Sequence, residues 1–167
     1  MTRIEIVATG PEFTGRGIRG FESVMEEIIS SAKSEILVVS YIITSSALHV
    51  LGLMDKALHK GVKITMVINN IHDLDPDLRK RLFSMERKFP GTFNLINFRD
   101  LADRNIHAKV IIADRKKAVI GSANLSWGGI RANYEIGVLI EGGPVWHIVK
   151  VIDNLLKELQ VKRQSMI

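Results

Sequence analysis

Apolar residues follow two spacings along the chain, and the regular change from one to the other predicts strands separated by helices. Compact apolar runs predict strands over residues 4–8, 35–43, 62–68, 92–98, 106–112, 118–122 and 133–140. Apolar positions three or four residues apart predict helices over residues 20–32, 44–59, 75–89 and from 144 onward. Helices placed between strands favour an α/β fold in which a mixed β-sheet is flanked by helices on both faces.

Two short patterns resemble ligand sites but have simpler explanations. Gly15-Arg-Gly17-Ile-Arg-Gly20 has the spacing of a dinucleotide-binding loop, yet residues 11–14 separate it from the preceding strand, and the next strand does not end in an acidic residue. His72-Asp73-x-Asp75 offers metal-binding side chains, but Asp75 before Pro76 is explained as a helix N-cap. We therefore expect neither a bound dinucleotide nor a metal ion, and no other cofactor.

The polar residues that point to chemistry lie in one predicted hairpin. In a strand over residues 106–112, period-two alternation places the His107 and Lys109 side chains on the same side. A second apolar run follows a short polar break, and the two runs predict a hairpin. A two-residue loop at 115–116 would place Lys109 opposite Ser122 and His107 opposite Asn124. A three-residue loop would shift this register by one and scatter the cluster.

These residue types suit attack on a phosphodiester. An imidazole titrates near neutral pH and can act as a nucleophile and later as a proton carrier, if another group holds its tautomer. Lys109 supplies fixed positive charge, and Ser122 and Asn124 can donate hydrogen bonds to non-bridging phosphate oxygens. Glu135 is alone in an apolar strand, where a buried carboxylate needs a partner such as an imidazole N–H. Such a site requires no metal ion.

Each of these residues also has a more ordinary interpretation when taken singly. A strand histidine is usually a hydrogen-bonded structural residue, and a lysine two positions away is usually a solvated charge. The joint occurrence of five side chains where one site needs them favours catalysis. Asp114 differs, because at a hairpin turn its side chain is expected to accept hydrogen bonds from nearby backbone N–H groups.

The pattern His107-x-Lys109-x-x-x-x-Asp114, followed by Gly121-Ser-x-Asn124, resembles the HKD motif of the phospholipase D superfamily. Asn133-Tyr-Glu135 is similar to the glutamate-bearing strand of the short bacterial endonucleases of that superfamily. The resemblance implies the superfamily's fold and metal-independent action on a phosphodiester through a covalent phosphohistidine.

The same resemblance implies a role for each residue of the motif. His107 is then the nucleophile, while Lys109 and Asn124 bind phosphate. Ser122 supports the pocket and Glu135 orients the histidine. Asp114 and Gly121 complete the motif as structural residues.

The chain departs from the full-length phospholipases of the superfamily, which carry two such motifs. None of the other histidines is followed by lysine at the second position; they are His49, His59, His72 and His147. The second catalytic histidine is therefore expected from a twofold-related copy, since an isologous interface places the same patch of both subunits face to face. We predict a homodimer with one active site shared across its axis.

Composition agrees with a compact enzyme that acts on a polyanion. A length of 167 residues favours one domain over residues 1–167, and the absence of cysteine excludes disulfides, thiolate catalysis and cysteine-based zinc sites. The net charge of +5 and the isoelectric point near 9.6 favour a nucleic acid through long-range attraction. About half of the basic residues are expected to be solvated surface charge, and the candidates for substrate binding are Arg16, Arg19, Arg104, Arg115, Lys116 and Arg131.

The distribution of apolar segments gives no indication of a membrane protein. The first ten residues alternate charged and apolar types, unlike the apolar core of a signal peptide, which favours a cytoplasmic location. The apolar runs are far shorter than the ~20 residues that span a bilayer. The last predicted helix combines an apolar stripe with alternating charges, as is typical of a helix packed on a sheet. We therefore expect no stable membrane association.

The first hypothesis is thus a homodimeric, metal-independent phosphodiesterase that acts as a nuclease on DNA or RNA. A phospholipid phosphodiesterase or phosphatidyl transferase would use the same chemistry but needs a means of reaching a bilayer. A nucleic-acid-binding module of the same fold without turnover is the third hypothesis, and the presence of every motif residue argues against it.

Overall fold

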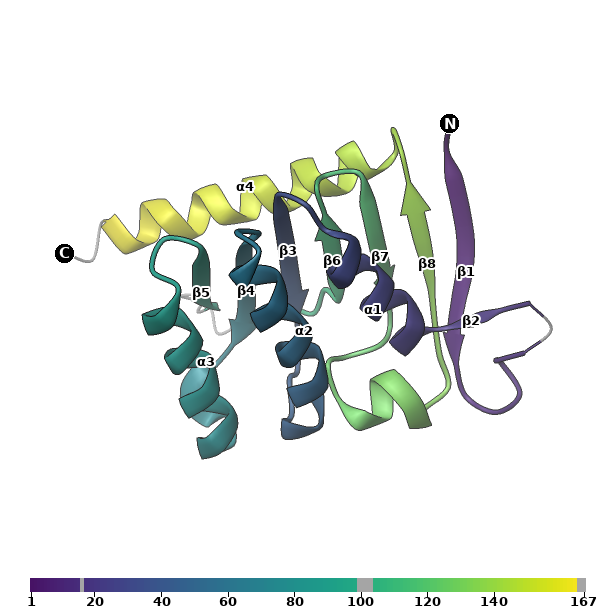
Figure 1. The fold of residues 1–167 in the computed structure, drawn as a ribbon, viewed down its shortest axis with the longest axis horizontal. Helices are drawn as coiled ribbons and strands as arrows, with labels where there is room; N and C mark the ends of the chain where they lie inside the picture. The colour runs from purple at the N-terminus through teal and green to yellow at the C-terminus, as the bar shows by residue number, and fades with distance from the viewer. Residues whose placement is uncertain (16, 99–103, 165–167) are drawn as a thin grey trace.

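Eight strands form one sheet in the order β2-β1-β8-β7-β6-β3-β4-β5. The structure, a computed structural model, describes residues 1–15, 17–98 and 104–164 (Figure 1). In chain order the elements are β1 (Arg3–Thr9), β2 (Arg19–Gly20), α1 (Phe21–Ser31), β3 (Glu35–Ser40), η1 (Ser45–Ala47), α2 (Leu48–His59), β4 (Lys63–Asn69), η2 (Ile71–Asp73), α3 (Pro76–Lys88), β5 (Phe93–Phe98), β6 (Val110–Ala113), β7 (Lys117–Gly121), η3 (Gly128–Ala132), β8 (Glu135–Glu141) and α4 (Val145–Gln164).

The sheet is mixed, as the alternation of predicted elements indicated. Strands β3, β4 and β5 are parallel and are connected through α2 and α3, whereas β6, β7, β8 and β1 continue the sheet with antiparallel neighbours. Parallel neighbours need crossover connections, and the helical spacing over residues 44–59 and 75–89 supplied them. The α/β prediction with a mixed sheet is confirmed.

Helices cover both faces of the sheet, and two hydrophobic clusters mark the two layers. Helices α1, α2 and α3 pack on one face, where the buried residues include Phe21, Ile36, Leu51 and Leu78. Helix α4 crosses the other face (Figure 1) and packs on a smaller cluster that includes Leu37, Val39, Ile112 and Val149. Val38 belongs to the first cluster and its neighbours Leu37 and Val39 to the second, as expected for a strand buried on both faces.

Two helix starts show where local sequence signals succeed and fail. Asp75 caps α3 as predicted, because its Oδ1 accepts hydrogen bonds from the backbone N–H groups of Asp77 and Leu78, both at 3.1 Å. The predicted cap at residues 44–46 is wrong. The Thr44 hydroxyl bonds to the Ser46 hydroxyl instead, residues 45–47 form a short 3₁₀ turn, and α2 begins only at Leu48.

The hairpin around Asp114 differs from its predicted register by one residue. Strand β6 begins at Val110 rather than near residue 106, and Ala113 pairs with Lys117, so the loop contains three residues. Lys109 therefore lies opposite Gly121, whose N–H bonds to the Lys109 carbonyl at 3.3 Å, and not opposite Ser122. Asp114 and the residue after it both adopt left-handed backbone conformations, with φ of 52° and 56°. The predicted two-residue loop is wrong.

The side chain of Asp114 joins the hairpin loop to the turn before β3. Its carboxylate accepts hydrogen bonds from the backbone N–H groups of Lys33, Ser34 and Glu35 at 2.7–3.1 Å and from the Ser34 hydroxyl at 2.8 Å. The expectation that the Asp114 side chain accepts hydrogen bonds from backbone N–H groups is confirmed. The donors, however, lie about eighty residues away in the chain, in the turn before β3. Burial disfavours the charged carboxylate, yet these bonds outweigh it and hold the pKa of Asp114 below its ordinary value.

Two further elements had no clear sequence signal. The two-residue strand β2 pairs parallel to β1, and residues 128–132 form one turn of π-helix just before β8. Among the described residues, no helix combines the length and apolar content needed to cross a bilayer.

Candidate active site

The motif side chains gather at one end of the sheet, where β3 and β7 end and β6 and β8 begin. This arrangement follows from the antiparallel pairing of β6 with β3 and β7, and of β7 with β8. The carboxyl ends of β3 and β4 lie at the same end, which is lowermost in Figure 1. Residues that are up to 94 positions apart in the chain, from Tyr41 to Glu135, thus lie at the same end of the sheet.

The side chains of His107 and Lys109 are in direct contact. The Lys109 Nζ lies 2.7 Å from the His107 Nδ1 and 2.8 Å from the His107 carbonyl oxygen. Both side chains project from the same side of the segment, as the alternation predicted, because Ile106, Ala108 and Val110 pack on the α4 face instead. His107 itself is exposed, so its ring faces the solvent from the end of the sheet.

Burial and a nearby carboxylate act on the Lys109 ammonium in opposite directions. Partial burial disfavours the charged form, and the negative charge of Glu135 favours it, and the net effect is a pKa of Lys109 below its ordinary value. The charges of Glu135 and Lys109 thus interact across the end of the sheet. The one-residue shift of the hairpin register therefore does not separate these two residues.

Glu135 bonds to neighbours that differ from the one expected. Its carboxylate accepts a very short hydrogen bond from the Ser122 hydroxyl and a weaker one, at 3.3 Å, from the Asn133 Nδ2. The Ser122 hydroxyl also accepts the Ile136 N–H at 3.1 Å. Within the described part of one subunit, the expected pairing of Glu135 with His107 is not formed. The carboxylate is instead held at the start of β8 by Ser122 and Asn133, and its negative charge acts on Lys109.

Asn124 is fixed through its side-chain oxygen. The Oδ1 accepts the backbone N–H of Ile42 at 3.3 Å, which leaves the amide NH₂ as the group that can donate to a ligand. Gly129, in the π-helical turn, packs directly against the Asn124 backbone. A Cβ at residue 129 would lie 2.6 Å from the Asn124 nitrogen, closer than any ordinary contact. The turn before β8 therefore holds the Asn124 backbone in place.

Two residues that sequence reasoning missed hold the histidine segment. Residues 104–109 have no regular secondary structure, and the buried Asn69 side chain replaces the missing ladder bonds. Its Nδ2 donates to the Ile106 carbonyl at 2.8 Å and to the Tyr41 carbonyl at 3.1 Å, and its Oδ1 accepts the Ile106 N–H at 2.9 Å. An asparagine directly after an apolar strand is the signal that was available, because a buried amide must find partners.

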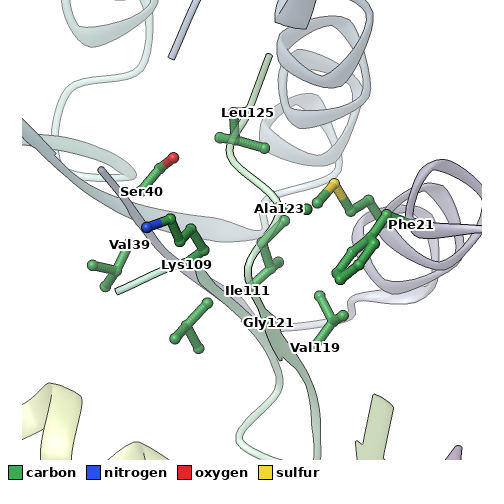
Figure 2. Close-up of a pocket in the computed structure, with 11 residues that line it drawn as sticks. Phe21, Val39, Ser40, Lys109, Ile111, Val119, Gly121, Ala123 and Leu125 are labelled. Atoms are coloured by element: carbon green, nitrogen blue, oxygen red, sulfur yellow. The ribbon is translucent and has the colours of Figure 1, made fainter. Parts of the chain in front are cut away.

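Tyr41 contacts both His107 and Lys109. Its ring lies against the His107 ring, with centroids 4.3 Å apart, and the Lys109 Nζ lies 5.1 Å from the Tyr41 centroid. The face of an aromatic ring attracts a cation, so Tyr41 also stabilises the lysine charge. Figure 2 shows the Lys109 stem beside Ser40 and Val39, at a small cavity of about 10 Å³.

Gly121 is required by close packing. A Cβ on Gly121 would lie 2.7 Å from the Gly137 Cα, the Ile136 carbonyl oxygen and the Phe21 ring. Figure 2 shows Gly121 beside the cavity, with Phe21 and Lys109 among the residues that line it. The close approach of β7 and β8 under Phe21 accounts for the glycine of the motif.

The candidate substrate-binding cations do not form one surface. Arg115 and Lys116 occupy the β6–β7 turn, roughly 20 Å along the strand from Lys109, and Arg115 pairs with Glu35 and Asp153. These two residues therefore lie away from the candidate site, and their role in substrate binding stays a prediction. The physical reason is that a hairpin tip and its strand ends lie at opposite ends of a sheet.

The other cations of that set have mixed placements. Arg19 pairs with Glu27 at 2.6 Å and with Glu5 at 3.8 Å, on the strand next to β1. Arg131 pairs with Glu22 and lies over the Trp127 ring, on the turn after Asn124. Arg104 is exposed at the start of the segment that carries His107. Arg16 lies outside the described residues.

The comparisons with known proteins agree with this geometry. The family model described as "Cardiolipin synthase, PLD-like domain" matches residues 25–160. The DISARM protein DrmC of Bacillus paralicheniformis is 33% identical over 159 residues, which cover 92% of this chain and 63% of that protein. The chain thus spans less than two thirds of the length of this relative.

Solved structures share the fold. Nuc of Salmonella typhimurium, described as a phospholipase D family member, has a TM-score of 0.70 at 21% identity and covers 98% of this chain and 95% of its own. NucT of Helicobacter pylori has a TM-score of 0.74 at 18% identity and covers 96% of this chain and 97% of its own. The fold and the family model together define a phospholipase D-like domain. The chain belongs to the phospholipase D superfamily, whose members act on phosphodiester bonds.

Proposed function

We propose that this protein is a metal-independent nuclease that hydrolyses DNA or RNA phosphodiesters through a covalent phosphohistidine at an active site shared by two subunits. The observation that carries the proposal is the contact of His107 with Lys109 at an exposed end of the sheet. Glu135 acts on Lys109 through its charge, and Asn124 bonds to Ile42, the residue after Tyr41. A nucleophile, a fixed cation and a neutral donor are what in-line transfer of a phosphoryl group needs.

The reaction divides into two displacement steps. The Nε2 of one His107 attacks phosphorus, the P–N bond forms, and the bond to the leaving oxygen breaks while the His107 of the second subunit donates a proton to that oxygen. The second imidazole then takes a proton from water, whose oxygen attacks phosphorus and releases the first imidazole. Lys109 and the Asn124 NH₂ stabilise the non-bridging oxygens in both steps.

The groups around His107 in one subunit support a role for a second copy. A nucleophilic Nε2 requires an Nδ1–H that is held by an acceptor. In the described part of one subunit, the side-chain group beside Nδ1 is the Lys109 Nζ, at 2.7 Å. The nearby carboxylate of Glu135 is held by Ser122 in its own subunit. A facing subunit brings a second Glu135 and a second His107 to the axis.

A polyanionic substrate is favoured by charge. The net charge of +5 attracts nucleic acid over long range. Arg104 lies on the same segment as His107, three residues before it, and is exposed to solvent there.

A second candidate function is phosphatidyl transfer or phospholipid hydrolysis. It is favoured by the family model, whose description names cardiolipin synthase. The same histidine chemistry would serve a lipid phosphodiester, with an alcohol in place of water in the second step.

One comparison of substrates separates these functions. The protein is incubated in excess EDTA with single-stranded DNA, duplex DNA, RNA and vesicles that contain phosphatidylglycerol, and His107→Ala is compared with His147→Ala, which changes another exposed histidine on α4. We expect cleavage of nucleic acid that is lost in His107→Ala and kept in His147→Ala, with retained nucleic-acid binding in both. Activity that disappears with EDTA, or that acts on vesicles alone, would contradict the proposal.

A further inference from the structure

A cleft lies beside His107 and is not used by the chemistry described above. It has a volume of about 410 Å³ and is bounded by the segment after β3, the segment after β4 and the approach to His107. Its polar lining residues are Tyr41, Thr44, Ser45, Asn69, Asn70, Asp73, Asp75 and Asn105. The carboxyl ends of parallel strands are the usual place for ligands in open α/β sheets, and this volume falls in the range of small-molecule sites.

Tyr41 connects the cleft to the catalytic pair. The residue lines the cleft, and its ring also lies against His107, with centroids 4.3 Å apart. Asn105 lines the cleft from a position two residues before His107. A phosphate held at His107 and Lys109 therefore has the cleft next to it, and a group attached to that phosphate can enter it.

The chemistry of the cleft excludes a second phosphate. Among its lining residues in the described part of the chain there is no lysine, arginine or histidine, and Asp73 and Asp75 contribute two carboxylates. Negative charge repels phosphate, whereas hydroxyls, amides and carboxylates are suitable partners for the hydrogen-bonding edges of a nucleobase. An aromatic wall and polar edges are the recurring features of sites that bind the unstacked bases of single strands.

We infer that this cleft is a nucleoside subsite, which receives the base next to the scissile phosphate of a single-stranded nucleic acid. The inference rests on the proposed nuclease function and specifies its substrate. In a duplex the same base is stacked and paired, and it must leave the helix before it can enter the cleft. The preference for single strands thus follows from the position of the cleft and not from recognition of a sequence.

The first experiment uses a single abasic nucleotide. An end-labelled single-stranded DNA that carries one abasic position is cleaved by the intact protein, and the product ladder is compared with that of the unmodified strand. We expect cuts at the bonds that flank the abasic position to fall about tenfold or more, while distant cuts stay unchanged. The matched duplex should be cleaved more slowly than the single strand. A ladder that is the same with and without the abasic position overturns the inference.

A blocking substitution tests the same cleft from the protein side. Ser45 is exposed and lines the cleft, so Ser45→Trp fills it, and Ser30→Trp places the same side chain at an exposed position on α1 as a control. The substrates are single-stranded DNA and bis(p-nitrophenyl) phosphate, a phosphodiester without a nucleoside. We expect Ser45→Trp to lower kcat/KM for single-stranded DNA and to leave hydrolysis of the small diester unchanged, and Ser30→Trp to change neither.

The outcomes distinguish the subsite from the function on which it rests. Cleavage of the small diester and of DNA, with no effect of Ser45→Trp or of the abasic position, overturns the subsite and leaves the nuclease in place. Cleavage of phospholipid vesicles without cleavage of DNA overturns both the nuclease and the subsite. Equal loss of both activities in Ser45→Trp, with an unchanged Ser30→Trp, also overturns the subsite, because it indicates damage to the catalytic pair.

Discussion

The Asn69 side chain is expected to hold the histidine segment, and its removal gives the most quantitative test of the site's architecture. Asn69→Ala deletes three hydrogen bonds, at 2.8, 2.9 and 3.1 Å, that join the end of β4 to Ile106 and Tyr41. A net contribution of about 1 kcal/mol per bond predicts a loss of about 3 kcal/mol in the free energy of unfolding. The Ile106 N–H and two carbonyls also lose their partners, so the value is a lower estimate.

Urea denaturation followed by circular dichroism measures this loss. With a denaturant slope of about 2 kcal/mol per molar, the midpoint of Asn69→Ala should fall by roughly 1.5 M. Asn97→Ala is the matched control, because Asn97 lies near the end of the neighbouring strand and its Oδ1 accepts one bond, from the Ile71 N–H at 2.9 Å. That variant should lose about 1 kcal/mol.

Activity separates positioning from stability. Under conditions where both variants are folded, Asn69→Ala should lower kcat more than Asn97→Ala, because only Asn69 bonds to the residue next to His107. Equal losses of stability in the two variants would refute the additive estimate. An unchanged kcat in folded Asn69→Ala would refute the positioning role.

Three further predictions follow from other contacts. Asp114→Asn should be less stable than the parent protein at neutral pH. Because the pKa of Asp114 is lowered in the folded protein, this difference in stability should shrink as pH falls through the acid range. Thermal melts at several pH values measure the difference, and a difference that grows in acid would contradict the prediction. Gly121→Ala should cost about 1–3 kcal/mol by overpacking against Phe21 and β8, and a melting temperature equal to that of the parent would exclude the close contact. Arg115→Ala should change stability by at most about 1 kcal/mol, since its ion pairs are exposed. Arg115→Ala should also leave nucleic-acid affinity unchanged. Weaker binding by this variant would indicate that Arg115 contacts the nucleic acid.

The fold was accessible from the sequence because each element carries its own periodicity. The strand runs and the helical stripes predicted an order of elements along the chain that the structure confirms. The Asp75 cap was predicted because it depends on residues two and three positions away. Local patterns of this kind act over a few residues, so they are visible without tertiary structure.

The hairpin register was not accessible in the same way. Asp114, the first loop residue, bonds to the turn before β3, about eighty residues away, and no local pattern contains that contact. The ion pairs of the basic residues also depend on tertiary contacts. Arg19, Arg115 and Arg131 are paired with acidic residues on other elements. Basic residues that were candidates for substrate binding are thereby used within the fold.

The motif predicted which side chains would meet but not what holds them. His107 and Lys109 are joined as alternation required, whereas Tyr41 and Asn69 come from the ends of β3 and β4 and have no link to the motif in sequence. Glu135 shows the same limit, because its bond to Ser122 depends on the pairing of β7 with β8.

The claim that two histidines from two subunits share one phosphorus atom is tested most directly with a mixed dimer. Parent and His107→Ala chains that carry different affinity tags are refolded together, the mixed species is purified through both tags, and its rate on single-stranded DNA is compared with that of the parent dimer. The composite site predicts activity near background, because the remaining histidine lacks its proton donor. A mixed dimer that retains half or more of the parent rate would contradict the shared site.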